Sequence, residues 1–450
     1  MSDIKKIKPS LPSGTRDFLP TEIAKRNFLF GVIKSVFEKY GFQPIETPVL
    51  ENLSTLTGKY GDEGDQLLFK ILNSGDFLKD ATPSDIEQKD YKKLLPKIAE
   101  RGLRYDLTVP LARYVVQHQN DLVFPFKRYH IAPVWRADRP QKGRYREFYQ
   151  CDADIIGSAS LINEIELTQI FQDVFDKLKL KVEIRINNRK ILEAISIYAG
   201  CPTKLESMTV AIDKLDKIGL EGISNELTQR GFTDDEIEKI KLLLQLSTLS
   251  DLSSYFSAIP IGLEGIKELE EVFQKSNCTS LTFDITLARG LNYYTGTIWE
   301  IKSLDTAMGS IGSGGRYANL TEMFGGKDMP GVGISFGVER IYDIMNELDL
   351  FPKNIQQSTQ LLFVHFSETN RDFCLPYVQQ LRSLGIASEL YPDKAKLDKQ
   401  MKYANAKGIP FVAVVGDDEM NAGFFMLKNM NSGEQKKMSF EELKLVLAHV

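Results

Sequence analysis

Hydrophobic spacing divides the first hundred residues into elements of different kinds. Apolar residues recur at helical spacing over residues 21–40, and Gly41 stops the pattern. This predicts a helix, followed by a strand over residues 42–50. Residues 71–102 are charged and follow neither period, so we interpret them as a loop-like insertion. Strand patterns resume near residues 103–107.

Two strand-like runs, residues 128–135 and 147–156, flank a basic loop and predict a long β-hairpin. The positive charge of the loop comes from Arg136, Arg139, Lys142, Arg144 and Arg146. Alternation along the second run predicts one face with an aromatic ring, an amide and two carboxylates. This face comprises Phe148, Gln150, Asp152 and Asp154. An aromatic ring with guanidinium groups suits a nucleotide, whereas an amide and carboxylates suit a cationic group or N–H donors.

The middle of the chain changes in composition. Residues 182–187 have a strand pattern, whereas residues 190–278 are polar, helical and rich in Leu, Lys and Glu. We interpret this shift as an inserted helical domain. Strand signals return at 281–285 and 296–301, and a later helix is predicted to end near Leu348.

A regular alternation of strands and helices follows a polar linker at 352–360. It predicts a separate α/β domain over residues 361–450. The predicted strands are 361–366, 388–391, 411–416 and 424–429. The predicted helices are 372–384, 397–407 and one that begins at Phe440.

Composition narrows the class of protein. The chain has 450 residues, 42% of them hydrophobic, which is enough for two or three globular domains. A net charge of -5 argues against nonspecific coating of nucleic acid. The amino-terminal residues lack an apolar signal core, and no stretch reaches the roughly 18 apolar residues of a membrane span, so we expect a cytoplasmic protein with no membrane partner. The four cysteines form no C-x-x-C pair, which supports neither a disulfide framework nor structural zinc.

Four segments carry motifs that belong together. They are residues 12–20, the hairpin 128–154, residues 287–295, and Gly314–Tyr317 with Gly337–Arg340. This set resembles histidyl-tRNA synthetase, a class II aminoacyl-tRNA synthetase, over almost the whole chain. The hairpin and the closing Gly-x-Glu-Arg are shared by class II enzymes in general. The sequences Ala-Arg-Gly-Leu-x-Tyr-Tyr and Gly-Gly-Arg-Tyr are the histidine-specific signatures.

The resemblance implies an α+β fold, with an antiparallel class II catalytic sheet flanked by helices. The implied domains are a catalytic domain in two parts, 1–189 and 279–351, a helical insertion, 190–278, and an α/β anticodon-binding domain, 361–450. The implied enzyme is a histidine–tRNA ligase that forms histidyl-adenylate with ATP and Mg2+ and transfers histidine to tRNA(His). It also implies a homodimer, because Pro48 corresponds to the proline of the class II dimer-interface motif.

The family reaction needs positioned cations, because attack of the histidine carboxylate on the α-phosphate of ATP concentrates negative charge there. The resemblance places the catalytic residues Arg136 and Arg289 on this phosphate, from opposite sides. It places Arg340 on the γ-phosphate and Phe148 on the adenine. The implied ATP-binding residues are Arg136, Asp138, Arg144, Phe148 and Arg340. The resemblance does not identify which residues bind the metal ion.

The amino-acid pocket follows from the same resemblance. The α-ammonium group of histidine is assigned to Asp106, Thr108 and Gln150, and the imidazole nitrogens to Asp154 and Tyr294. A carboxylate accepts a hydrogen bond and a phenol can donate one. Together they match the donor and the acceptor nitrogen of an imidazole, which few other amino acids can provide. The pocket also includes Tyr293 and Tyr317.

Other residues are implied to contact tRNA or depart from the family pattern. Arg139 and Gln141 lie at the loop tip, where the family contacts the acceptor end of tRNA. Asn292 and Ala318 stand where many relatives have Asp, which bears on the orientation of neighbouring groups.

Two other functions fit parts of this pattern. A noncatalytic regulator, such as the synthetase-like subunit of ATP phosphoribosyltransferase, typically lacks the anticodon domain and the full set of arginines. A sensor of histidine or uncharged tRNA would keep the fold but lose adenylation. Both features that the regulator lacks are present in this sequence, and an ATP–pyrophosphate exchange assay separates the sensor from the ligase.

Overall fold

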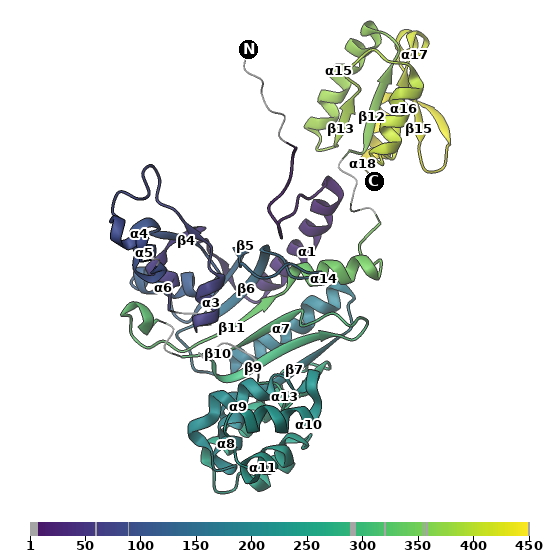
Figure 1. Cartoon of the computed structure of the whole chain (residues 1–450). Helices are drawn as coiled ribbons and strands as arrows, with labels where there is room; N and C mark the ends of the chain where they lie inside the picture. Colours follow the sequence, from purple (N-terminus) through teal and green to yellow (C-terminus); the bar gives the residue numbers. More distant parts are fainter. Residues whose placement is uncertain are drawn as a thin grey trace. The chain divides into compact units, whose positions relative to one another are not determined.

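Figure 1 shows the chain, of which the computed structural model describes residues 8–58, 61–88, 90–288, 294–318, 321–353, 355 and 359–448. The chain divides into two compact units. The first comprises Met1–Phe18 and Arg26–Leu350, and the second comprises Leu19–Lys25 and Phe351–Val450. None of the helices described is long and apolar enough to cross a membrane.

The first unit is built around an eight-stranded sheet with the order β1-β5-β6-β11-β10-β9-β7-β8. Its inner neighbours are antiparallel, whereas the edge pairs β1–β5 and β7–β8 are parallel. The strands are β1 (Gln43–Pro44), β5 (Phe126–Trp135), β6 (Glu147–Ile156), β7 (Val182–Asn188), β8 (Leu281–Phe283), β9 (Tyr294–Ser303), β10 (Gly312–Tyr317) and β11 (Gly331–Phe336). The sheet and its helices confirm the predicted α+β class.

The α-helices of the first unit flank this sheet and fill most of residues 189–275 (Figure 1). They are α1 (Pro20–Lys39), α2 (Leu53–Leu56), α3 (Gly61–Leu67), α4 (Pro83–Glu87), α5 (Tyr91–Ile98), α6 (Thr108–His118), α7 (Ile162–Leu178), α8 (Arg189–Tyr198), α9 (Leu205–Ile212), α10 (Leu215–Gln229), α11 (Asp234–Leu244), α12 (Leu249–Tyr255), α13 (Pro260–Lys275) and α14 (Val338–Glu347). Helices α8–α13 occupy the segment in which the sequence predicts helices. Its boundaries as a separate domain stay a prediction.

One face of the sheet is closed by aromatic packing. The ring of Phe336 on β11 lies among Phe37 of α1 and Phe171 and Phe175 of α7, at centroid distances of 5.9, 5.1 and 5.7 Å. Because side chains alternate along a strand, the neighbouring Ser335 points to the opposite face. Helices α1 and α7 therefore cover one face and leave the other for polar side chains.

The predicted hairpin is confirmed, since β5 and β6 pair along their whole length. On its other side β6 pairs with β11, which puts Gly333 opposite Asp154 although they are far apart in the sequence. Three adjacent strands thus contribute alternate residues to the uncovered face.

The segment before the hairpin differs from the prediction. Within residues 42–50, only β1 and the first residue of β2 are strand, and Pro48 has no N–H for a sheet ladder. The predicted strand 103–107 ends at Leu103. Residues 71–102 are not loop-like but contain α4, α5 and parts of two strands, β3 and β4, of a three-stranded sheet. The strands of this sheet are β2 (Leu50–Asn52), β3 (Lys70–Ile71) and β4 (Arg101–Leu103), in the order β2-β4-β3.

Local capping explains the two short helices that the sequence analysis missed. The side chain of Thr82 accepts from the backbone N–H of Asp85, and the side chain of Asp90 accepts from Lys92 and Lys93. Such caps stabilise helices too short to show a hydrophobic period.

The second unit is a five-stranded sheet with the order β13-β12-β14-β15-β16, flanked by helices. Its strands are β12 (Leu361–His365), β13 (Ser388–Leu390), β14 (Phe411–Val415), β15 (Phe425–Asn429) and β16 (Gln435–Met438). Its helices are α15 (Glu368–Ser383), α16 (Leu397–Ala406), α17 (Asp417–Ala422) and α18 (Phe440–Ala448). The sequence predicts all of these except α17 and β16, which are short and polar.

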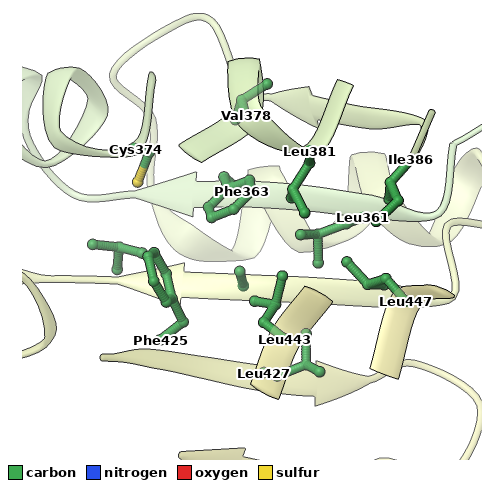
Figure 2. Packing of buried hydrophobic residues seen from close by; sticks show 12 residues of the cluster. Leu361, Phe363, Cys374, Val378, Leu381, Ile386, Phe425, Leu427, Leu443 and Leu447 are labelled. Carbon is green, nitrogen blue, oxygen red and sulfur yellow. The ribbon is translucent and has the colours of Figure 1, made fainter. Parts of the chain in front are cut away.

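Figure 2 shows the core of this unit, where side chains from β12, β15, α15 and α18 meet. The rings of Phe363 and Phe425 pack edge to face, with centroids 5.7 Å apart. Leu381 of α15 and Leu443 of α18 are fully buried against them. The second unit therefore has a hydrophobic core of its own.

Candidate active site

The uncovered face of the large sheet forms the floor of a cavity of about 750 Å³. The hairpin loop, the start of α14 and part of α9 contribute to its wall. It brings together most of the residues singled out in the sequence: Asp106, Thr108, Arg136, Asp138, Arg144, Phe148, Gln150, Asp154, Tyr294, Tyr317 and Arg340.

Asp154 is the centre of the buried end of the cavity. Its Oδ1 accepts a hydrogen bond of 2.7 Å from the hydroxyl of Tyr317, and its Oδ2 lies 2.6 Å from Nη2 of Arg128. All three side chains are buried. Burial raises the pKa of Asp154, against the charge of Arg128 and the hydrogen bond from Tyr317. Burial and then Asp154 raise the pKa of Tyr317, so its hydroxyl stays a donor.

The strand register creates this cluster. Arg128 on β5 stands directly opposite Asp154 on β6, and Gly333 stands opposite it on β11. A Cβ on Gly333 would lie 1.9 Å from Oδ1 of Asp154. Glycine is therefore required here by the close approach of the carboxylate.

Tyr294 lies beside this cluster and also lines the cavity. Its ring packs over Gly315 of β10, where a Cβ would lie 2.5 Å from Cδ1 of Tyr294. The hydroxyl that Asp154 accepts from is that of Tyr317. The two tyrosines stand opposite each other on β9 and β10.

Arg136 is held at the other end of the floor. Its Nε donates to the carbonyl of Tyr105 at 3.0 Å, and its Nη2 lies 3.5 Å from Oε1 of Gln150. Its guanidinium carbon lies 4.3 Å from the ring centre of Tyr105 and 5.2 Å from that of Phe148. Gln150 in turn donates from Nε2 to Ser335 at 3.2 Å. The guanidinium is thus oriented before any ligand arrives.

Arg340 and the hairpin loop form the outer wall. Arg340 donates from Nε to the carbonyl of Gly143 at 3.2 Å and from Nη1 to that of Ser310 at 2.6 Å. Nη1 of Arg144 lies 3.8 Å from Oδ1 of Asp138. Two arginines therefore face the cavity from this wall, in addition to Arg136.

Glu339, next to Arg340, ties the amino-terminal segment to the site. It pairs with Arg26 at 2.8 Å and with Arg16, and accepts from the backbone N–H of Tyr149 at 3.3 Å. Burial would raise the pKa of Glu339, but the hydrogen bonds and charges of Arg26 and Arg16 lower it. The carboxylate stays ionised and fixes α14 against β6.

Some predicted residues are not brought into the cavity. Arg139 and Gln141 lie in the hairpin loop but outside the cavity wall. Gln141 pairs there with Arg144 through two backbone hydrogen bonds. Arg289 and Tyr293, with Asn292, fall outside the described residues.

Arg128 and Asp152 were not given roles from the sequence. Alternation places Asp152 on the correct face, but the sequence pattern predicts Arg128 only as the start of a strand. Counting back equally from both ends of the hairpin loop would have paired Arg128 with Asp154. The sequence therefore contains the information that pairs Arg128 with Asp154, but using it requires the register of the hairpin.

Metal ligands are not concentrated in the site. Among the described residues, no group of three or more His, Cys, Asp or Glu side chains could hold a metal ion. The four cysteines are free thiols.

Comparisons with known sequences extend over the whole chain. A family model described as histidyl-tRNA synthetase matches residues 72–341, and an anticodon binding domain model matches residues 360–449. The histidine–tRNA ligase of Phocaeicola vulgatus is 53% identical over 449 residues, covering 98% of this chain and 99% of that protein. That of Porphyromonas gingivalis is 53% identical over 452 residues, covering 98% and 100%.

Solved structures agree. The crystal structure of histidyl-tRNA synthetase from Nostoc sp. PCC 7120 has a TM-score of 0.82 at 32% identity, covering 99% of this chain and 100% of that chain. A Bacillus halodurans structure described as an ATP phosphoribosyltransferase regulatory subunit/histidyl-tRNA synthetase has a TM-score of 0.72 at 19% identity, covering 92% and 99%, and shares the fold alone. Fold, site and matches define an aminoacyl-tRNA synthetase. The chain belongs to the histidyl-tRNA synthetase family and has the aminoacylation function of a histidine–tRNA ligase.

Proposed function

We propose that the cavity is where histidine and ATP react to form histidyl-adenylate. The observation that carries this proposal is the division of the cavity into two chemically different ends. One end has a buried carboxylate held by Arg128 and Tyr317, and the other has Arg136 and Arg340 facing the cavity. An acidic, hydrogen-bonding end suits an imidazole and an ammonium group, and a guanidinium-lined end suits phosphates.

At the acidic end, Asp154 accepts from one imidazole N–H, while the tyrosine hydroxyls of Tyr294 and Tyr317 complete the wall, with Tyr293 as a further member. Asp106, Thr108 and Gln150 bind the α-ammonium group. A buried site that satisfies each polar group of one amino acid leaves those groups unpaired with a competitor.

At the basic end, Arg136 and Arg289 stabilise the charge that develops on the α-phosphate. Arg340 and Arg144 hold the outer phosphates, and Phe148 stacks on adenine. Arg136 is suited to this role because it is already oriented, so little reorganisation is needed during the reaction. Guanidinium forks also hold two phosphate oxygens at once.

Magnesium is compatible with this site. The family uses ATP, and Mg2+ takes most of its ligands from phosphates and water, with one or two carboxylates from the protein. Asp138 and Glu300 line the cavity outside the proposed histidine pocket and would supply such ligands. The ion would neutralise phosphate charge when bound.

Assembly, location and tRNA contacts are parts of the same proposal. We expect a homodimer that works in the cytoplasm, with Arg139 and Gln141 on the acceptor end of tRNA(His). Both residues lie in the hairpin loop outside the cavity wall, and Arg139 carries a positive charge in that loop. The expected domains are the catalytic parts 1–189 and 279–351, the insertion 190–278 and the anticodon-binding domain 361–450.

The exchange of pyrophosphate into ATP tests the chemistry. Histidine alone among the standard amino acids should support exchange. A regulator or sensor of the same fold would bind histidine without exchange, and comparable exchange with another amino acid would contradict the proposed pocket.

Gly333→Ala should raise the KM for histidine by about 10- to 100-fold, since displacement of a binding group by about 1 Å has effects of this size. The added Cβ would force the carboxylate of Asp154 to move. The KM for ATP is the internal control, because neither Arg136 nor Arg340 contacts Gly333 in any bond described. Equal increases in both KM values would instead indicate general damage to the sheet.

A chain that ends after Lys353 should still form adenylate but aminoacylate tRNA poorly. The second unit has its own core, and residues 361–450 contain 11 basic and 11 acidic residues, so a broad electrostatic RNA surface is not expected. Recognition of unstacked anticodon bases fits better. Exchange and aminoacylation are measured on the same preparation. Full aminoacylation efficiency would remove the anticodon-binding role.

A further inference from the structure

Asp152 is a second buried carboxylate on the cavity floor, between Gln150 and Asp154 on the same face of β6. It is 3% exposed, and its Oδ1 has no hydrogen-bond partner among the described residues. Nor does it form an ion pair within the described ranges. A buried carboxylate oxygen without a donor is costly unless a ligand supplies one.

The protein groups around Asp152 do not supply a free cation. The groups that face it are Arg128 and His130 on β5, Asp154 on β6, Ser335 on β11 and Asp106 before α6. Arg128 is already paired with Asp154. Burial, and then the charges of Arg128 and Arg104, lower the pKa of His130 to about 3, so its ring is neutral. The one cation among these groups is therefore already paired, while Asp154 and Asp106 add negative charge near Asp152.

We propose that Asp152 binds the α-ammonium group of histidine, together with Asp106 and Gln150. This inference rests on the histidine pocket proposed above. Because Asp152 stands two residues nearer to Gln150 than Asp154 does, it faces the α-ammonium end of a ligand whose imidazole reaches Asp154. The ammonium group supplies both the missing donor and the missing positive charge.

A change of protonation should accompany this binding. Burial raises the pKa of Asp152 to about 7, with Asp154 and Asp106 acting in the same direction and with Arg128 and a hydrogen bond from Ser335 opposing them. Near pH 7 the empty pocket is thus partly protonated at Asp152. Arrival of the ammonium favours the carboxylate, and the proton leaves to solvent.

Two unreactive ligands separate the ends of histidine. Histidinol keeps the ammonium and imidazole groups, whereas imidazolepropionate lacks the ammonium. Asp152→Asn should weaken histidinol binding by roughly 10- to 100-fold, the range for a hydrogen bond to a charged group, and leave imidazolepropionate binding unchanged. Asp154→Asn is the matched control and should weaken both ligands.

Calorimetry at pH 7 in two buffers of different ionisation enthalpy measures the affinities and the protons released. The native protein should release about half a proton more with histidinol than Asp152→Asn does, as expected for a group with its pKa near the pH. With imidazolepropionate the two proteins should not differ. Proton release is compared between the two proteins for the same ligand, because the imidazole rings of the two ligands themselves titrate near pH 7.

The outcomes separate the two proposals. If Asp154→Asn weakens neither ligand, the proposed histidine pocket itself is wrong. If Asp154→Asn weakens both but Asp152→Asn affects them equally or not at all, only the role of Asp152 is overturned. Equal proton release by the native protein and Asp152→Asn with histidinol would also overturn it.

Discussion

Arg136→Met should lower the rate of histidine-dependent ATP–pyrophosphate exchange by about 10² to 10³, the usual cost of removing one oriented donor from a developing negative charge. The KM for ATP should change much less. Arg136 is positioned by the carbonyl of Tyr105 and lies near the rings of Tyr105 and Phe148, so its loss removes an oriented charge. Steady-state exchange over a range of ATP concentrations measures both quantities.

Arg139→Met is the matched control, because Arg139 lies in the same loop but outside the cavity wall. Its exchange rate should be unchanged, whereas transfer of histidine to tRNA should fall. Arg289→His should resemble Arg136→Met. If either of these two variants kept normal exchange and lost only transfer from preformed adenylate, its proposed place on the α-phosphate would be wrong.

Arg128→Met should reduce the free energy of unfolding of the first unit by about 3–5 kcal/mol, the usual cost of breaking a buried ion pair by removing one partner. The carboxylate of Asp154 would remain buried without its cation, and the KM for histidine should rise. Both tryptophans, Trp135 and Trp299, lie on strands of the large sheet, so their fluorescence in urea reports the unfolding of this unit.

Arg113→Met is a control for loss of a partly buried ion pair outside the cavity, since Arg113 lies 2.7 Å from Glu51. It should cost some stability but leave the KM for histidine unchanged. Adding Asp154→Asn to Arg128→Met should restore part of the lost stability because the uncompensated charge is gone. No recovery would show that Arg128 stabilises the sheet by packing rather than by charge.

The local parts of the site could be predicted from the sequence because their geometry depends on neighbours in the chain. Alternation over ten residues placed Phe148, Gln150, Asp152 and Asp154 on one face, and the structure has them there. The basic loop between two strand-like runs was sufficient to predict the hairpin. That Gln150 and Asp154 bind histidine is implied by the family resemblance and stays a prediction.

The remaining parts depend on strand pairing between distant segments. Nothing in the sequence alone puts Gly333 beside Asp154 or brings the hydroxyl of Tyr317 to that carboxylate, because β6, β10 and β11 meet only in the folded sheet. The prediction of a loop-like segment over residues 71–102 was wrong for a different reason. Their helices are capped by Thr82 and Asp90 and are too short to show a period.

The place of β11 beside β6 also affects how the chain can fold during synthesis. β11 begins about 175 residues after β6 ends. At the usual rate of translation this gap takes roughly 10–35 s, during which a nascent hairpin has an open strand edge. Helices α8–α13 emerge within this interval and set much of its length. Lengthening the insertion would therefore prolong the exposure of that edge to aggregation while leaving the finished active site unchanged.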